Sequence, residues 1–280
     1  MPQKLFEIKN LSCAYGDKPP VLRIRQMTIP AGKLIFVLGI SGVGKSTFIE
    51  TLGLMNRTIV QDADTEVRFF AEETQPIELR NFWDKDNKTV SEFRNKYLSF
   101  IFQNTNLMPN FTAGENMCIS QLIRGVPLAE AKKYVLQVMR ELNLEDYIFD
   151  RKITDLSGGQ RQRLAFVRAV TSDFRVLFGD EPTGNLDKDT AFRLMRLLKA
   201  NLHNHNRTGI IVSHDIDLAL NFADTIILLT PSADGTHGEA LQKNILQQEN
   251  GKWKRSDNRD LPDAAGWIYE QLVGQQEKVL

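Results

Sequence analysis

A glycine-rich stretch followed by a lysine offers the clearest chemistry in this sequence. Residues 39–47 read GISGVGKST, and they fit the P-loop spacing G-x-x-x-x-G-K-[ST]. Glycines in such a loop let backbone N–H groups close around phosphate oxygens, while Lys45 adds a positive charge and Ser46 a hydroxyl for Mg²⁺. The pattern predicts a site for a nucleoside triphosphate such as ATP, formed by Gly39, Ile40, Ser41, Gly42, Val43, Gly44, Lys45, Ser46 and Thr47.

Four polar side chains that follow apolar runs belong to the same prediction. Asp180 and Glu181 follow VLFG, His214 follows IIVS, and Gln103 follows YLSFIF. Because the ends of parallel strands meet along one rim, we expect these groups beside the P-loop. Asp180 and Gln103 can then hold Mg²⁺, Glu181 can polarise the attacking water, and the γ-phosphate can be held by His214. Taken singly, they could equally be carboxylates that cap the next turn, a surface histidine and a solvated amide.

A second anion-binding helix start is predicted at LSGGQ, residues 156–160. Ser157 is a favourable N-cap residue, and two glycines leave the amides of the first helical turn unshielded. The P-loop already surrounds a triphosphate from one side, so a second cradle is useful on the open side of another subunit's nucleotide. Two identical chains related by a two-fold axis can supply this to each other. The residues expected to act in trans are Ser157, Gly158, Gly159 and Gln160.

In order and spacing, these motifs resemble the ATP-binding subunits of ABC transporters, over about residues 4–230. The resemblance rests on GISGVGKST, Gln103, LSGGQ, VLFGDEPTGNLD at 176–187, and His214. It implies a P-loop NTPase (RecA-like) α/β core with a parallel sheet, an N-terminal antiparallel β subdomain and an α-helical signature subdomain. It also implies a Mg²⁺-dependent ATPase that forms a head-to-tail, ATP-dependent homodimer.

The resemblance assigns further roles to individual residues. Tyr15 is similar to the aromatic residue that stacks on adenine, although a surface tyrosine at the end of a strand is an alternative. Glu181 resembles the catalytic base and His214 the switch histidine. Asp187 resembles the aspartate that communicates across the dimer with the other P-loop. The stretches EPTGNLD and QNTNLMPNFTAGENM look most like the branch of lipoprotein-release, macrolide-efflux and cell-division ATPases.

Composition and charge exclude several other classes of protein. The 280 residues contain 35 basic and 35 acidic side chains, so no net field attracts nucleic acid, and none is expected as a partner. Cys13 and Cys118 lie far apart, outside any C-x-x-C pair, which favours two reduced thiols. The N-terminus lacks a signal-peptide pattern, and the longest apolar runs are too short to cross a bilayer. We expect a cytoplasmic protein, held at the inner face of the cell membrane through a partner.

Hydrophobic periodicity predicts strands that alternate with helices, and hence a mostly parallel sheet covered on both faces. Residues 4–15 alternate in part and suggest an edge strand, while 127–144 suggest an amphipathic helix with Leu128, Ala131, Val135, Val138 and Leu142 on its buried face. A hairpin that turns at Asn250–Gly251 and a closing helix at 262–274 are expected near the end. Other strands are expected at 33–39, 67–70, 97–102, 176–183, 208–215 and 225–229, and a helix at 190–202.

Two segments depart from the family pattern. Between Met55 and Tyr97 the usual Ser-Gly is missing and acidic residues are in excess, so 71–95 is either a solvated surface excursion or a partner-contacting insertion. The tail after Thr230 is longer than a minimal subunit requires. We expect an ATPase domain over 1–230, with a helical subdomain at about 104–156, and a C-terminal extension over 231–280.

The expected work of this ATPase is done on a separate polytopic membrane subunit. Leu107, Met108 and Phe111 are the predicted docking site for a short helix of that partner, unless the helical subdomain buries them in its own core. Two other functions stay open. One is a soluble regulatory or nucleic-acid-associated ABC ATPase, against which a single cassette without sustained heptads argues. The other is a module of the cell-division type, in which ATP mainly clamps the dimer.

Overall fold

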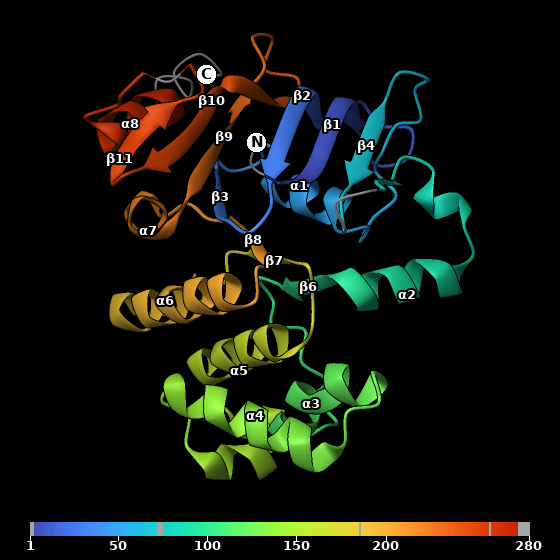
Figure 1. The fold of residues 1–280 in the computed structure, drawn as a ribbon, viewed down its shortest axis with the longest axis vertical. Coiled ribbons are helices and arrows are strands. Elements are labelled where there is room, and N and C mark those ends of the chain that lie inside the picture. Colours follow the sequence, from blue (N-terminus) through green and yellow to red (C-terminus); the bar gives the residue numbers. More distant parts are fainter. Residues whose placement is uncertain (1–2, 72–74, 185, 258, 274–280) are drawn as a thin grey trace.

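A single curled sheet forms one half of the molecule and helices form the other (Figure 1). The computed structural model describes residues 3–71, 75–184, 186–257 and 259–273. Across these residues the sheet has 11 strands in the order β5-β4-β1-β2-β10-β9-β3-β8-β7-β6, with β11 paired to β10. The strands are β1 (Lys4–Cys13), β2 (Leu22–Pro30), β3 (Leu34–Leu38), β4 (Glu66–Phe69), β5 (Ile77–Glu78), β6 (Leu98–Ile101), β7 (Val176–Asp180), β8 (Thr208–Val212), β9 (Thr225–Pro231), β10 (Gly238–Glu249) and β11 (Lys252–Arg255).

The sheet combines a parallel part with an antiparallel part. Strands β9, β3, β8, β7 and β6 run parallel to their neighbours in this series. Strands β3 and β8 are buried along their whole length, because helices and other elements cover both faces of this part. Strands β2, β1, β4 and β5 pair antiparallel. The predicted fold class, an α/β P-loop core with an antiparallel β subdomain, is confirmed.

The prediction that residues 4–15 form an edge strand is wrong. Strand β1 pairs with β2 on one side and with β4 on the other. Its partial alternation has another cause, namely that one face of the sheet is buried while the other carries charges. On that solvated face Arg68 of β4 lies 3.6 Å from Glu7, and Lys9 lies 3.1 Å from Glu66. The alternation of apolar and polar residues in β1 therefore reflects one solvent-exposed face of the sheet and not an unpaired edge.

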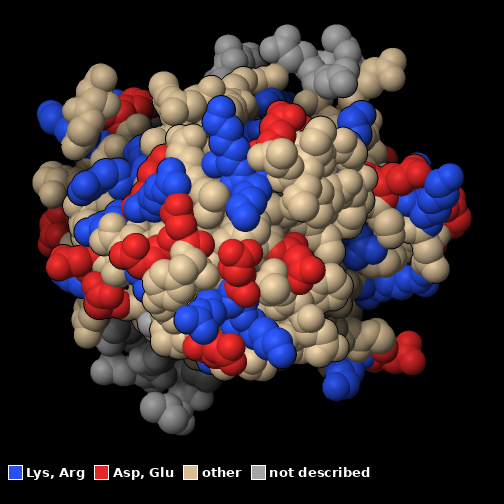
Figure 2. All heavy atoms as spheres, turned by 90° about the horizontal axis from the view of Figure 1, so that it is seen from below, with Lys and Arg blue, Asp and Glu red and all other residues tan. Residues whose placement is uncertain are grey.

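The helices form two groups. One group, at the bottom of Figure 1, is the helical subdomain of α3 (Ala113–Ile123), α4 (Leu128–Glu141) and α5 (Gly158–Thr171). The face seen from below mixes acidic and basic side chains (Figure 2). The other group lies along the sheet and comprises α1 (Lys45–Leu52), α2 (Asn87–Tyr97), α6 (Lys188–Asn204), α7 (Ile216–Phe222) and α8 (Ala264–Val273). Short 3₁₀ turns lie at Phe82–Asp84, Asp146–Asp150 and Ile153–Asp155, and the second of them packs on α3 and α4.

Helix α4 differs from its prediction at one position. Ala131, Val135 and Val138 are buried, and Leu142 is buried directly after the helix ends. Leu128, which we placed on the same face, is 58% exposed. It is the first residue of the helix, so its side chain lies beyond the end of the interface with the neighbouring helices.

The acidic segment at 71–95 is more ordered than a solvated excursion. Its described residues form β5, a 3₁₀ turn and α2; residues 72–74 lie outside the described part. Phe82 and Phe93 are buried, with ring centroids 4.6 Å apart, and Phe93 also meets Phe69 of β4. The aromatic residues therefore fasten this segment to the sheet, while its charged residues remain on the surface.

The tail after Thr230 is built into the sheet. Strand β10 lies between β2 and β9, and it forms a hairpin with β11 through Asn250 and Gly251, whose φ angles are 52° and 77°. Two positive φ angles in a two-residue loop are typical of a type I′ turn. At the other end of β10, a Cβ added to Gly238 would lie 1.9 Å from the carbonyl oxygen of Val43. The tail therefore packs directly against the backbone of the P-loop.

The cysteine at the end of β1 provides a test of burial. The Cys13 side chain is fully buried, and burial raises the pKa of its thiol from 9.0 to about 11. The folded state thus binds a proton that the unfolded state releases between these pH values, so stability is lost as the pH rises. We expect the free energy of unfolding, measured with urea, to fall between pH 9 and pH 11 in the wild-type protein. This fall is expected to be about 2 kcal/mol larger than in Cys13→Ala. Equal slopes would contradict the burial of the thiol.

None of the helices that the structure describes is both long enough and apolar enough to cross a bilayer.

Candidate functional site

The P-loop joins β3 to α1 and leaves the start of that helix open. Gly42 and Gly44 have φ angles of 79° and 98°, a region that strains residues with a Cβ. Among the described residues no side chain caps the N-terminus of α1, so the first N–H groups of the helix are free for an anion. A Cβ at Gly39 would lie 2.7 Å from Val43 Cγ1 and 2.8 Å from the carbonyl oxygen of Leu229.

The Lys45 ammonium lies over this loop. Its Nζ donates hydrogen bonds to the carbonyl oxygens of Gly39 and Ile40, both at 2.9 Å. Burial lowers the pKa of Lys45, and the nearby carboxylates of Glu181 and Asp180 act in the opposite direction. The lysine is thus placed where phosphate oxygens can replace the two carbonyl groups as its partners.

A cavity of about 340 Å³ brings the P-loop and the strand ends together. Gln103, Asp180 and Glu181 line it, as the sequence predicts, although Gln103 is exposed. Its other lining residues are Val21, Ser41, Gly42, Gly44, Lys45, Ser46, Thr47 and Val212. The Ser46 hydroxyl, the Asp180 carboxylate and the Gln103 amide supply oxygen donors in one place, a set that suits Mg²⁺.

Glu181 and His214 are in direct contact. The Glu181 Oε2 and His214 Nδ1 atoms are 2.6 Å apart, and the side chains are 18% and 72% exposed. The backbone of Glu181 has φ 49°, a conformation that is unfavourable for a residue other than glycine, and its N–H donates to the carbonyl oxygen of Val212 at 3.0 Å. This conformation turns the chain sharply after β7 and directs the carboxylate toward the histidine.

Tyr15 lies beside the first turns of α1. Its hydroxyl is 3.1 Å from Thr47 Oγ1 and 3.3 Å from Glu50 Oε2. Partial burial raises the pKa of Tyr15, and the Glu50 carboxylate adds to this effect. The ring is 40% exposed, so one part of it remains open to a ligand.

The second glycine site begins α5 and lies apart from the cavity. Ser157 and Gln160 form a capping box, in which the Ser157 hydroxyl accepts from the Gln160 N–H at 3.2 Å. None of residues 157–160 lines the cavity that contains the P-loop. Among the atoms that the structure describes, a Cβ at Gly158 would meet none within 4 Å, and one at Gly159 would touch Leu186 alone, at 3.8 Å. The fold of the described chain therefore does not require glycine at 158.

Asp187 has a structural function that the sequence reasoning missed. Its Oδ1 accepts from the Thr190 N–H at 2.9 Å and caps α6. This backbone hydrogen bond is the main reason that the pKa of Asp187 is lowered. A capping aspartate before a helix is a signal that the sequence contained. The neighbouring Asn185 of the EPTGNLD motif lies outside the described residues.

Two further residues hold the loop that follows Gln103. Arg168 of α5 donates to the carbonyl oxygens of Thr105 and Asn106, at 3.1 and 2.8 Å. The buried Asn116 of α3 accepts from the Met108 N–H at 2.7 Å and donates back to its carbonyl oxygen. The Arg168 contacts join segments more than 60 residues apart in the chain, so no local pattern pointed to them. Arg168 thus links the loop after Gln103 to the helix that carries the signature, and Asn116 links the same loop to α3.

The predicted docking residues on this loop divide into two kinds. Leu107 packs on the core of the helical subdomain, whereas Phe111 is 39% exposed. Met108 is partly buried. Leu107 therefore belongs to the core of the subdomain, whereas Phe111 remains open to solvent, and the docking site stays a prediction.

This geometry defines a P-loop ATPase with a second, separate glycine site. Known proteins that resemble the chain belong to the same class. The family model described as ABC transporter matches residues 22–184. The lipoprotein-releasing system ATP-binding protein LolD of Idiomarina loihiensis is 33% identical over 254 residues, which cover 90% of this chain and 100% of that protein. LolD of Myxococcus xanthus is 34% identical over 218 residues, 77% of this chain and 92% of that protein.

Solved structures give the same result. A dimeric structure of MJ0796, described as a bacterial ABC transporter cassette, matches with a TM-score of 0.72 at 27% identity, over 88% of this chain and 100% of that one. A dimeric post-hydrolysis state of MJ0796, bound to ADP and Pi, matches with a TM-score of 0.68 at 28% identity, over 85% and 99%. The chain belongs to the ABC transporter family. It is an ATP-binding subunit and an ATPase, as its motifs predicted.

Proposed function

We propose that this chain powers a lipoprotein-releasing system, as a Mg²⁺-dependent homodimer that acts on separate polytopic membrane subunits from the inner face of the membrane. The names of the LolD relatives support the substrate class. The dimeric MJ0796 cassettes support the assembly. No nucleic acid takes part in this proposal.

The division of the site between two places is the observation that carries the proposal. The cavity contains the P-loop and the carboxylates, but none of the signature residues 157–160. At the same time, Gly158 faces open space and its missing side chain serves no contact within the described chain. A second subunit that brings Ser157, Gly158 and Gly159 to the γ-phosphate completes the site.

In this proposal each residue has a defined task. Lys45 exchanges its two carbonyl partners for phosphate oxygens, and the free N–H groups of α1 hold the same anion. Water attacks the γ-phosphorus, the bond to the ADP oxygen breaks, and Glu181 holds the water and receives its proton. His214, through its contact with Glu181 Oε2, fixes the direction of that carboxylate. Ser46, Asp180 and Gln103 would hold Mg²⁺, which neutralises charge on the phosphates.

The assigned contacts across the dimer also belong to this proposal. Tyr15 stacks on adenine beside α1, with its hydroxyl held by Thr47. Asp187, fixed in place by its cap on α6, approaches the opposite P-loop. In the same proposal the exposed Phe111 contributes to the surface that meets the membrane subunit.

Light scattering during size-exclusion chromatography tests the assembly. Glu181→Gln slows hydrolysis, so with ATP and Mg²⁺ we expect its mass to double from that of the monomer. Adding Ser157→Arg places a bulky cation at the interface and is expected to abolish this doubling, while ATP binding to the P-loop persists. A dimer that survives Ser157→Arg, or that forms equally without nucleotide, would contradict the proposed arrangement.

A further inference from the structure

The Tyr15 hydroxyl belongs to a chain of hydrogen bonds that starts in the P-loop and ends in the turn after α1. It lies 3.1 Å from Thr47 Oγ1 and donates to Glu50 Oε2 at 3.3 Å. The same carboxylate oxygen accepts from Asn56 Nδ2 at 2.6 Å. Because a carboxylate only accepts, the Tyr15 proton points to Glu50, and the phenol oxygen accepts from the Thr47 hydroxyl. Every proton in this chain therefore has one defined acceptor.

The way in which α1 ends places Asn56 beside Glu50. Leu54 has φ 51°, and its N–H donates to the carbonyl oxygen of Thr51 at 3.2 Å. The N–H of Met55 donates to the carbonyl oxygen of Glu50 at 2.8 Å. These two bonds and the left-handed residue form the Schellman motif, which ends a helix and turns the chain back. Asn56 is the next residue, so its amide reaches the carboxylate one turn earlier in the helix.

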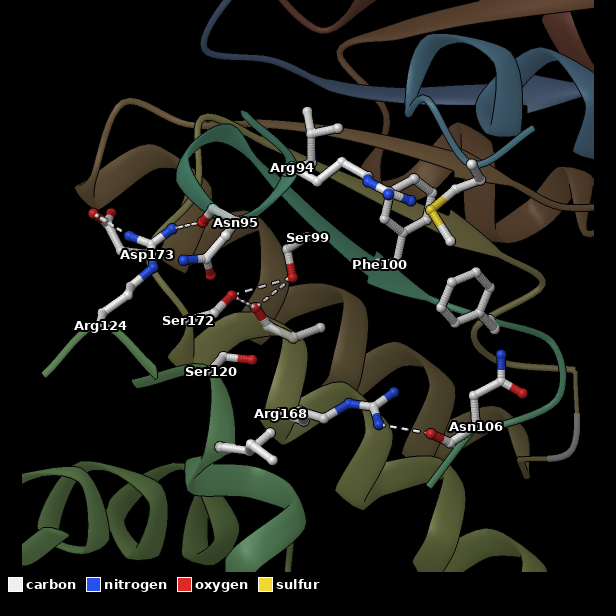
Figure 3. A pocket seen from close by; sticks show the side chains of 15 residues that line it. Arg94, Asn95, Ser99, Phe100, Asn106, Ser120, Arg124, Arg168, Ser172 and Asp173 are labelled. Atoms are coloured by element: carbon white, nitrogen blue, oxygen red, sulfur yellow. Dashed lines mark hydrogen bonds and ion pairs between the residues drawn. The ribbon is translucent and has the colours of Figure 1, made fainter. Parts of the chain in front are cut away.

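The two residues after this turn have different surroundings. Met55 lines a separate cavity of about 390 Å³, together with Arg94 and Phe100, which are both labelled in Figure 3. Asn56 is not among the described residues that line that cavity. Its amide is directed to Glu50 instead. Asn56 thus serves the carboxylate beside Tyr15.

The chain beyond the turn also holds the backbone in front of Tyr15. The Ala14 N–H donates to the carbonyl oxygen of Thr58 at 2.8 Å. The Thr58 side chain is buried, and its Oγ1 lies 2.6 Å from Thr51 Oγ1 of α1. Tyr15 is therefore held on both sides, at the preceding residue and at the hydroxyl. A ring held in this way loses little conformational freedom when a ligand stacks on it.

We propose that Glu50 and Asn56 are positioning residues for the base of the bound nucleotide, and that they act through the Tyr15 hydroxyl. The inference rests on the proposed function, because it needs Tyr15 to stack on adenine. Tyr15 is 40% exposed, so part of its ring is open, while its hydroxyl is bound to the helix whose start holds the phosphates. Base and phosphates then meet one rigid element. Such preorganisation strengthens binding in the ground state and the transition state alike, so it changes KM and not kcat.

The test compares ligands with and without a base, on the full-length chain. By isothermal titration calorimetry with Mg²⁺, we expect Glu50→Ala to weaken ADP binding about fivefold, the usual effect of one hydrogen bond. Inorganic pyrophosphate has no base and is expected to bind this variant as well as it binds the wild type. Glu50→Gln keeps an acceptor oxygen for the Tyr15 proton and is expected to restore ADP binding. In ATP hydrolysis, Glu50→Ala is expected to raise KM and to change kcat by less than about twofold.

A double-mutant cycle shows whether Glu50 acts through the tyrosine. With Tyr15→Phe already present, Glu50→Ala is expected to cause no further loss of ADP affinity, because the hydroxyl that it binds is gone. An equal loss in both backgrounds would overturn the proposal, and so would a matching loss of pyrophosphate affinity. Thermal unfolding of each variant shows whether a loss of binding reflects a loss of fold.

Tyr15→Ala separates this inference from the proposed function. If Tyr15→Ala weakens ADP binding and Glu50→Ala does not, the positioning by Glu50 is wrong and the stacking stands. If Tyr15→Ala binds ADP as tightly as the wild type, the stacking itself is wrong, and the inference falls with it.

Discussion

Glu181→Gly is expected to abolish ATP hydrolysis and to leave the protein as stable as before, or more stable. The carboxylate that would receive the proton is lost, so turnover falls by about 10³-fold, within the usual range for a general base. The backbone, in contrast, is relieved. Glu181 has φ 49°, and a glycine adopts this conformation without the steric penalty of about 1 kcal/mol.

Two other variants separate the chemical effect from the backbone effect. Glu181→Gln keeps the Cβ, so it is expected to lose hydrolysis with no gain in stability. Glu181→Ala removes the contact with His214 and also keeps the steric penalty. Phosphate release and urea unfolding measure the two effects independently. Glu181→Gly that unfolds more easily than Glu181→Ala would show that the positive φ angle stores no strain.

Gly158→Val is expected to lower ATPase activity strongly in a protein whose monomer folds normally. The added side chain enters open space in the subunit that carries it, so the free energy of unfolding stays within about 0.5 kcal/mol of wild type. In the proposed dimer the same side chain enters the partner's nucleotide site and displaces the N–H groups that hold phosphate. We expect turnover to fall by about 100-fold, as when an electrostatic donor is removed from an active site.

Gly39→Ala is the informative control for this prediction. Its Cβ would lie 2.8 Å from the carbonyl oxygen of Leu229 within the same chain, so the substitution is expected to destabilise the monomer. The described fold of the subunit thus requires glycine at 39 but not at 158. Normal activity of Gly158→Val would place the signature away from the nucleotide of the second chain.

Local patterns in the sequence predicted much of the fold. The apolar run LIFVL became the buried strand β3, and the glycines and lysine after it became the open start of α1. The pairing of β1 was not accessible in this way, because its second partner, β4, is set by contacts distant in sequence. Leu128 was misplaced because periodicity identifies a helix face but not where the interface along it ends.

The candidate site was predicted in its residue types but not in its conformation. Nothing local in the sequence signals that Glu181 adopts a positive φ angle or that it touches His214. Both depend on where β7 and β8 end relative to each other. Arg168 was visible only as one cation on a helix, since its acceptors, in the loop after Gln103, are brought to it by the packing of the helical subdomain.

The central position of β10 has a consequence for biosynthesis. The ribosome releases the P-loop early, yet the strand that packs against Val43 begins only at Gly238. Pairings between segments so distant in sequence form late in folding, because the entropy of closing a long loop is lost before the contacts form. A nascent chain is therefore expected to gain its phosphate site only after β10 has been synthesised. Copies whose synthesis stops before β10 then remain unable to bind ATP.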